Sequence, residues 1–167
     1  MKTVVIYETK YGSTKDYAEW IAEELKCPIY SRKNFSVKSI DDYDTFIIGS
    51  CVQVGSLKAG KWLNQIWPRI EKKKVILFSV SGAGPSEKEA IQGFLDKSIS
   101  QDIQKKVSYF PLQGRQIMSQ YPFLMRFMLK MVANMSKDPA EKAGIAADYD
   151  FVKKENIAPI VQAALKS

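Results

Sequence analysis

The chain has 167 residues, 46% of them hydrophobic, and a formal net charge of +7. This length can bury a core without disulfides or a structural metal. With no histidine and only two cysteines, Cys27 and Cys51, the sequence excludes a Cys/His zinc site and a serine–histidine triad, and we expect no metal. The positive charge favours an anionic partner, such as nucleic acid, acidic lipid or a polyanionic small molecule.

The chain begins without the basic and apolar pattern of a signal peptide. No apolar run reaches the roughly 18 residues that a membrane-spanning helix needs. We therefore expect a cytoplasmic protein.

The first half of the chain alternates apolar runs with segments of helical periodicity. Pro68 should end or bend one of the helices because proline lacks an amide donor. In chain order we expect a strand, a helix, two strands and a helix at Thr3–Tyr7, Thr14–Leu25, Pro28–Ser31, Asp41–Ser50 and Lys58–Trp67.

The second half continues this alternation. Ser86 is a plausible cap for one helix, with Glu89 three residues on. Pro111 places the last strand at a sheet edge, and Pro159 is tolerable only in the first turn of a helix. The expected elements are a strand, a helix, a strand and a helix at Lys74–Gly82, Ser86–Lys97, Val107–Leu112 and Asn156–Lys166.

Continuous apolar strands separated by helices predict a parallel sheet that is covered on both faces. The sequence thus predicts an α/β fold, a doubly wound five-stranded parallel sheet within a single domain, residues 1–167. In such sheets ligands bind outside the carboxyl ends of the strands.

The loop after the first strand is rich in hydroxyls around one glycine, at the start of a helix, where backbone amides and the helix dipole favour an anion. The alternative is that Ser13 caps this helix, with Asp16 in a capping box. The triphosphate pattern GxxxxGK[ST] and the dinucleotide pattern GxGxxG are absent, so a phosphate monoester fits better. The candidate residues are Thr9, Lys10, Tyr11, Gly12, Ser13 and Thr14.

Two further strand-end loops are small and nearly uncharged, which suits a flat heteroaromatic ring held by main-chain groups. The alternative is ordinary tight-turn chemistry. Cys51 could be a reactive thiol or a small buried residue, and it lacks the C-x5-R partner of a phosphatase nucleophile. The candidates are Ser50, Cys51, Val52, Gln53, Val54 and Gly55 in one loop, and Ser81, Gly82, Ala83 and Gly84 in the other.

The segments VVIYETKYGSTKDYAEWIAEEL and DDYDTFIIGSCVQVG, with the strand order 2-1-3-4-5, resemble flavodoxin-like FMN proteins. Within them the chain is most similar to the menaquinone-dependent protoporphyrinogen dehydrogenase family, which carries an insertion like YFPLQGRQIMSQYPFLMRFMLKMVANM after the fifth strand. The resemblance implies that Thr9–Thr14 bind the phosphate of FMN. It also implies that Cys51–Gly55 and Ser81–Gly84 flank its isoalloxazine ring.

Two features depart from typical flavodoxins. Neither ring loop contains an aromatic residue that could stack on the ring. Electron-carrier flavodoxins are strongly acidic, whereas this chain is basic. We therefore expect a poor low-potential carrier.

The insertion, 113–137, is predicted to be helical, basic and rich in methionine. In Pro122–Met135 the polar residues are Arg126, Lys130 and Asn134, which form one narrow stripe on a helix. This pattern allows a core helix, a homodimer contact or a segment lying on an anionic membrane surface. Arg115 is a candidate partner for a carboxylate or phosphate, or else a solvated surface residue. The intervening Met and Leu residues argue against nucleic-acid binding.

From these observations we predict an FMN-dependent oxidoreductase that oxidises protoporphyrinogen IX or a similar apolar substrate with a quinone. We predict that the protein is cytoplasmic. If the insertion binds an anionic membrane surface, the protein would attach peripherally to the inner face of the cell membrane. The alternatives are a one-electron flavodoxin carrier and a flavin-free scaffold that binds a partner or membrane.

Overall fold

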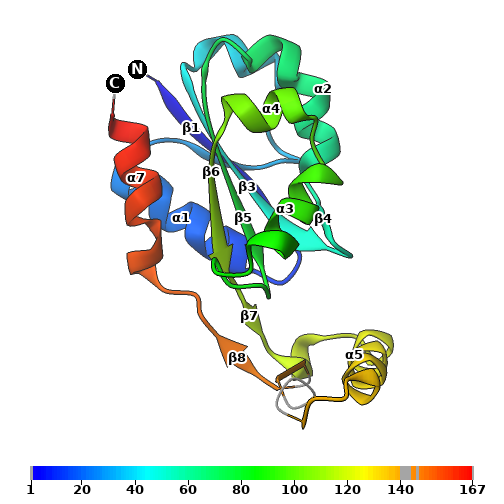
Figure 1. Cartoon of the computed structure of the whole chain (residues 1–167). Helices are drawn as coiled ribbons and strands as arrows, with labels where there is room; N and C mark the ends of the chain where they lie inside the picture. Colours follow the sequence, from blue (N-terminus) through cyan, green and yellow to red (C-terminus); the bar gives the residue numbers. More distant parts are fainter. Residues whose placement is uncertain (1, 140–143, 146, 167) are drawn as a thin grey trace. The chain divides into compact units, whose positions relative to one another are not determined.

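The computed structural model describes residues 2–139, 144–145 and 147–166, and the chain divides into two compact units (Figure 1). Unit 1 comprises Met1–Gly114 and Val152–Ser167, and unit 2 comprises Arg115–Phe151.

Unit 1 alternates strands and helices, as the sequence predicts. Its elements are β1 (Thr3–Glu8), α1 (Ser13–Leu25), β2 (Ile29–Ser31), the 3-10 helix η1 (Val37–Asp42), β3 (Thr45–Gln53), β4 (Ser56–Leu57), α2 (Gly60–Ile70), β5 (Lys74–Ser81), α3 (Lys88–Asp96), α4 (Gln101–Lys106), β6 (Ser108–Gln113), η3 (Lys154–Ile157) and α7 (Ala158–Leu165).

The sheet of unit 1 has the order β2-β1-β3-β5-β6, and every neighbouring pair in this path is parallel. The short strand β4 pairs antiparallel with β3 beside this path. Taken in chain order, the parallel strands follow the order 2-1-3-4-5, so the predicted doubly wound α/β fold is confirmed. β6 lies at one end of the path, which confirms the edge position expected from Pro111.

Helices cover both faces of this sheet: α1 and α7 lie on one side, and α2, α3 and α4 on the other (Figure 1). The strands divide their side chains between these layers. In β3, Phe46 and Ile48 join the cluster that contains α2, whereas Ile47 joins the cluster of α1 and α7. Burying such a side chain contributes about 1.5–3 kcal/mol, which is why these strands read as unbroken apolar runs.

Helix α2 does not end at Pro68, so of the two expectations, an end or a bend at this proline, the end near Trp67 is wrong. The helix continues to Ile70, and the Glu71 amide still donates to the Trp67 carbonyl at 2.9 Å. Pro68 is exposed while Ile66, Trp67 and Ile70 are buried. Burial of this face offsets the hydrogen bond that proline cannot make.

The helix predicted over Ser86–Lys97 is present as α3, and a second, unpredicted helix follows it. Helix α3 starts at Lys88, with Glu87 in the cap position and no side-chain cap, so the Ser86 cap is wrong. The unpredicted helix α4 is capped by Ser100, whose side chain accepts the Ile103 amide. Pro159 lies in the first turn of α7, as expected.

Unit 2 contains the strand pair β7 (Arg115–Gln116) and β8 (Tyr149–Asp150), the 3-10 helix η2 (Met118–Gln120) and helix α5 (Phe123–Met135). The Gln116 side chain donates to the carbonyls of Ile145 and Ala147, both at 2.9 Å. Unit 2 therefore extends beyond the predicted helical segment 113–137 and closes with a strand pair that the sequence did not indicate.

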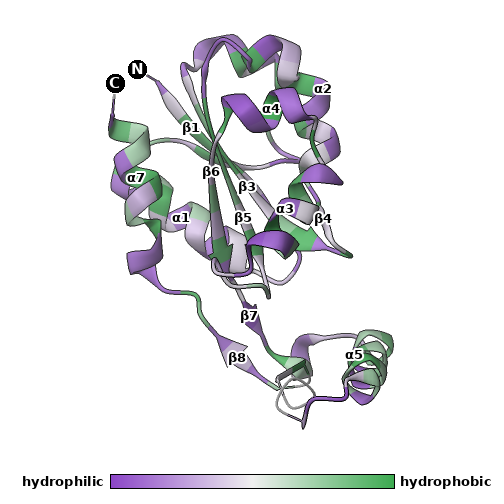
Figure 2. Cartoon of the chain, viewed as in Figure 1, coloured by the Kyte–Doolittle hydropathy of each residue, from purple (hydrophilic) through white to green (hydrophobic). Residues whose placement is uncertain are grey.

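Within its own unit, α5 leaves most of its large apolar side chains uncovered. Figure 2 colours much of this helix as hydrophobic, with hydrophilic positions between, and Ala133 is its buried residue. The core-helix interpretation of α5 is therefore wrong for unit 2. The side chains exposed by half or more are Phe123, Leu124, Phe127, Met128, Met131, Val132 and Met135.

Candidate functional site

The first candidate loop joins β1 to α1 at the carboxyl edge of the sheet. Gly12 has a φ of 94°, a left-handed conformation that favours glycine. Its amide donates to Thr9 Oγ1 at 3.1 Å, and its carbonyl accepts the Asp16 amide at 3.0 Å. Gly12 is the N-cap and no side chain caps α1, so the Ser13 capping box is wrong.

The first turn of α1 buries two hydroxyl residues, Ser13 and Thr14. Thr14 is 1% exposed, and its Oγ1 has no hydrogen-bond partner among the described residues. An unsatisfied buried hydroxyl costs about 1–3 kcal/mol. Here it belongs to the first turn of a helix, where amides and the dipole attract an anion. These residues therefore fit a phosphate group.

A second glycine, which the sequence analysis did not include in the site, lies against this turn. A Cβ on Gly114 would meet Val80 Cγ1 at 3.0 Å and Ser13 Oγ at 3.6 Å. Its amide donates to the Ser81 carbonyl at 2.8 Å. Gly114 thus lets the end of β6 approach the start of α1. The available signal was its position directly after the last predicted strand.

The second candidate segment, Ser50–Gly55, is a hairpin and not the loop that was expected. β3 extends to Gln53, and β4 pairs back on it with Val52 opposite Leu57. Val54 and Gly55 form the turn with φ values of 50° and 71°. Val54 is 92% exposed, an unusual position for a β-branched residue with positive φ.

Ser50 and Cys51 are held by the fold at the base of this hairpin. Ser50 Oγ accepts the Ala59 amide at 3.0 Å and donates to the Cys51 carbonyl at 3.1 Å, so it supports the start of α2. Burial raises the pKa of the Cys51 thiol, the nearby Lys58 lowers it and Glu8 raises it. This thiol is therefore a weaker nucleophile at neutral pH than a free cysteine.

The third candidate loop, Ser81–Gly84, is held in place by two side chains that the sequence analysis did not identify. Gln113 Nε2 donates to the Gly82 carbonyl at 3.0 Å. Glu87 Oε1 accepts the Gly84 amide at 2.7 Å. Within the loop, Ser81 Oγ donates a hydrogen bond to the Ala83 carbonyl at 3.1 Å. Glu87 is close to this loop in sequence, whereas no local pattern marks Gln113, which comes from a different strand.

The three cationic residues predicted for substrate or membrane binding, Arg115, Arg126 and Lys130, all belong to unit 2. Arg115 Nε lies 3.7 Å from Asp150 Oδ2, opposite it in the β7–β8 pair. The structure thus supplies Arg115 with a carboxylate from its own chain, and both interpretations of Arg115 stay predictions. Arg126 and Lys130 are exposed on α5, one helical turn apart.

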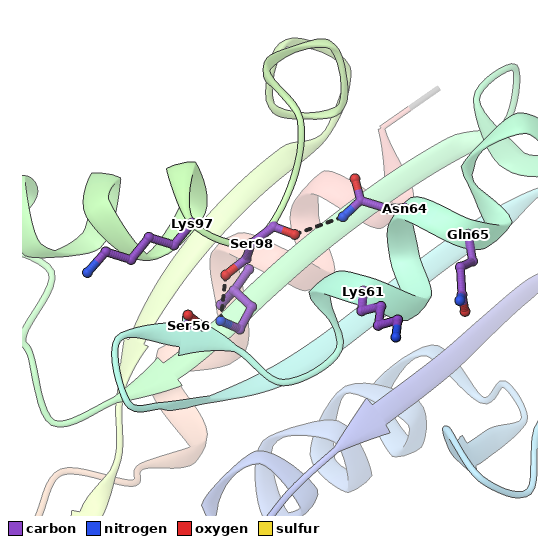
Figure 3. Close-up of a pocket in the computed structure, with 7 residues that line it drawn as sticks. Ser56, Lys61, Asn64, Gln65, Lys97 and Ser98 are labelled. Atoms are coloured by element: carbon purple, nitrogen blue, oxygen red, sulfur yellow. Dashed lines mark hydrogen bonds between the residues drawn. The ribbon is translucent and has the colours of Figure 1, made fainter.

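Two grooves lie outside these loops. Figure 3 shows one of about 530 Å³, whose walls are joined by the Asn64 amide donating to the Ser98 carbonyl at 2.8 Å. The other, of about 520 Å³, includes Lys2 and Thr3 at the amino end of β1. The first is lined by Ser56, Leu57, Lys61, Asn64, Gln65, Lys97 and Ser98.

Across the described ranges, no cluster of three or more His, Cys, Asp or Glu side chains could bind a metal. The same residues include no helix with the length and apolarity required to cross a membrane.

Comparison with known proteins gives a family match. The flavodoxin domain model matches residues 4–143. A flavodoxin, WrbA-like protein from Agrobacterium tumefaciens is 16% identical, with 96% of this chain and 97% of that chain covered and a TM-score of 0.50. Two-electron reduced flavodoxin from Megasphaera elsdenii is 17% identical, with 65% and 82% covered and a TM-score of 0.51. These likenesses show the shared fold. No curated protein gave a significant match.

Proposed function

The chain belongs to the flavodoxin domain family and binds FMN, and from this premise we propose that it is an FMN-dependent oxidoreductase. The proposed reaction takes an electron pair and the accompanying protons from protoporphyrinogen IX or a similar apolar reduced substrate. A quinone accepts them and leaves as the quinol.

The observation that carries the cofactor assignment is the buried Thr14 hydroxyl in the first turn of α1. Together with the amides after Gly12, it would hold the phosphate of FMN. The two ring loops, Ser50–Gly55 and Ser81–Gly84, would lie along the isoalloxazine. When bound, FMN supplies reversible electron-pair chemistry. Since the chain has no histidine, water or a Lys or Tyr side chain would carry protons at the site.

Charge and the exposed face of α5 favour an apolar, anionic substrate. From Gln104 through Lys137 the chain has no acidic residue. Arg126 and Lys130 stand beside a face with Phe127 and Met131 more than half exposed. Such a face suits a flat apolar macrocycle with propionate groups and a lipid-dissolved quinone. The specific assignment to protoporphyrinogen rests on the family resemblance of this insertion.

The same helix supports attachment to an anionic membrane surface. Its 13 residues give about 20 Å of helix, less than the roughly 30 Å of a bilayer's hydrocarbon core. We therefore infer that α5 lies in the membrane interface, with its cations at the headgroups and its apolar face toward the acyl chains. A homodimer contact through α5 is the competing outcome.

Anaerobic mixing tests the reaction. FMN-loaded protein should lose its visible flavin absorption when protoporphyrinogen is added and regain it with a menaquinone analogue, while apo protein should do neither. Retention of the oxidised spectrum would show that the substrate assignment is wrong. At roughly −0.3 kcal/mol for each of about thirty non-hydrogen atoms, FMN should bind with submicromolar affinity, which a titration can measure.

Two alternatives predict different results. A one-electron carrier should show widely separated one-electron steps and a very low second potential in a redox titration. A flavin-free scaffold should stay colourless when FMN is added. The charge of +7 argues against the carrier, and the unsatisfied Thr14 hydroxyl argues against the scaffold.

A further inference from the structure

A buried carboxylate stands immediately before the phosphate loop. Glu8 is the last residue of β1, is 8% exposed and pairs in register with Ser50 on β3. Thr9, the first residue of the phosphate loop, follows it directly. A buried carboxylate is costly unless it is paired, and beside a bound dianionic ester it would also repel the ligand.

One arginine pairs with this carboxylate through both of its oxygens. Arg32 Nε donates to Glu8 Oε2, and Arg32 Nη2 lies 3.4 Å from Glu8 Oε1. Arg32 directly follows β2, and its amide donates to the Tyr7 carbonyl at 2.8 Å. The backbone of the arginine is therefore fixed to β1 next to the residue that its side chain neutralises.

The thiol of Cys51 shows that this ion pair and the phosphate loop share one neighbourhood. Burial raises the pKa of this thiol most and Lys58 lowers it; the charge of Glu8 then raises this pKa, and a hydrogen bond from the Lys10 amide lowers it. Lys10 lies inside the phosphate loop. Glu8 and the backbone of the phosphate loop therefore both lie close to the side chain of Cys51, a residue of β3.

From this geometry we propose that Arg32 is a positioning residue for the phosphate of FMN, which acts through Glu8. It cancels the carboxylate charge next to the loop and holds that side chain by a two-point contact. This inference rests on the proposed FMN site. Arg32, which follows β2, would thus favour binding of FMN without affecting riboflavin. Riboflavin lacks the phosphate and carries no charge for Glu8 to repel.

The test compares the affinities of FMN and riboflavin for four proteins, measured by quenching of flavin fluorescence. These are the wild type, Arg32→Gln, Glu8→Gln and the double variant. Arg32→Gln should weaken FMN binding about tenfold, because the Glu8 charge would then repel the phosphate at a partly buried site. The affinity for riboflavin should not change. Glu8→Gln should retain FMN affinity, and the double variant should restore it.

Salt gives a second readout. The loss in Arg32→Gln should shrink as ionic strength rises, because added ions screen the repulsion, and Arg32→Lys should recover most of the affinity. Riboflavin binding and a cooperative unfolding transition identify variants that are folded.

Three results would overturn the inference. Equal losses for FMN and riboflavin would indicate a structural role for Arg32. A double variant as weak as Arg32→Gln would mean that Arg32 contacts the ligand directly. Unchanged FMN affinity in Arg32→Gln would remove the role while leaving the proposed function intact. Wild-type protein that binds no FMN would overturn the proposed function and this inference together.

Discussion

The two units treat similar apolar residues in opposite ways. In unit 1, Phe46 and Phe78 are completely buried between a sheet and its covering helices. In unit 2, Phe123 and Phe127 on α5 are 76% and 52% exposed. Unit 2 spans Arg115–Phe151, fewer than the roughly 40 residues that usually support a core alone. Apolar residues therefore form a core in the first unit and an exposed apolar surface on α5 in the second.

The largest expected effect is on the stability of unit 1. Phe78→Ala should lower the free energy of unfolding by about 3–5 kcal/mol, because it removes a buried ring and leaves a cavity. Gly49 packs against this ring, since a Cβ there would lie 2.3 Å from Phe78 Cζ. Phe127→Ala is the matched control on α5 and should cost less than about 1 kcal/mol. Urea unfolding measures both, and equal losses would contradict the contrast between the units.

The next effect concerns the surface of α5. Arg126→Glu combined with Lys130→Glu should reduce sedimentation with vesicles that contain anionic lipid, since each lost cation is worth about 1 kcal/mol near such a surface. FMN binding should not change. Lys33→Glu with Lys38→Glu alters the net charge equally on unit 1 and should retain vesicle binding. Unchanged sedimentation of the α5 variant, with a concentration-dependent increase in mass by ultracentrifugation, would instead assign α5 to a dimer contact.

Thr14→Val separates ligand binding from stability. Removing the unsatisfied hydroxyl should stabilise the apo protein by about 1 kcal/mol, because no buried polar group is left without a partner. The same change should weaken FMN binding about tenfold, because the phosphate would lose one hydrogen-bond donor. Thermal unfolding without FMN and a flavin titration measure the two effects. Wild-type FMN affinity in this variant would count against the phosphate site.

Gly12→Val tests the same loop through its backbone conformation. The substituted residue would need a φ of 94°, so both the loop and FMN binding should be impaired, without the stabilisation expected for Thr14→Val.

The smallest effect should come from the exposed tip of the hairpin. Val54→Asn should stabilise the apo protein by up to about 1 kcal/mol, because asparagine tolerates positive φ better than a β-branched residue. Gly55→Ala, at a φ of 71°, should have the opposite sign and serves as the control. Both are measured by thermal unfolding. A loss of stability in Val54→Asn would show that Val54 makes apolar contacts that outweigh its backbone conformation.

The sequence alone determined the main alternation of strands and helices, and the sheet order was part of the resemblance to flavodoxin-like proteins. Its strands read correctly because a parallel sheet covered on both faces requires apolar residues at nearly every position, as in Phe46–Ile48. The phosphate loop was also predictable from the sequence. Thr9, Gly12 and Thr14 are close in sequence, so a local pattern describes them.

Tertiary structure decided the features that depend on distant partners. The two-residue strand β4 is too short to show periodicity, and Ser98 Oγ holds it by accepting the Leu57 amide at 2.7 Å. Gly114 reaches Ser13, and Arg32 pairs with Glu8, only after the strands have aligned. Helix α5 is the converse case, since its pattern allowed a core position but the described residues of unit 2 leave its apolar face uncovered. Local periodicity records which face of an element is apolar, whereas strand register and the available packing partners decide what that face meets.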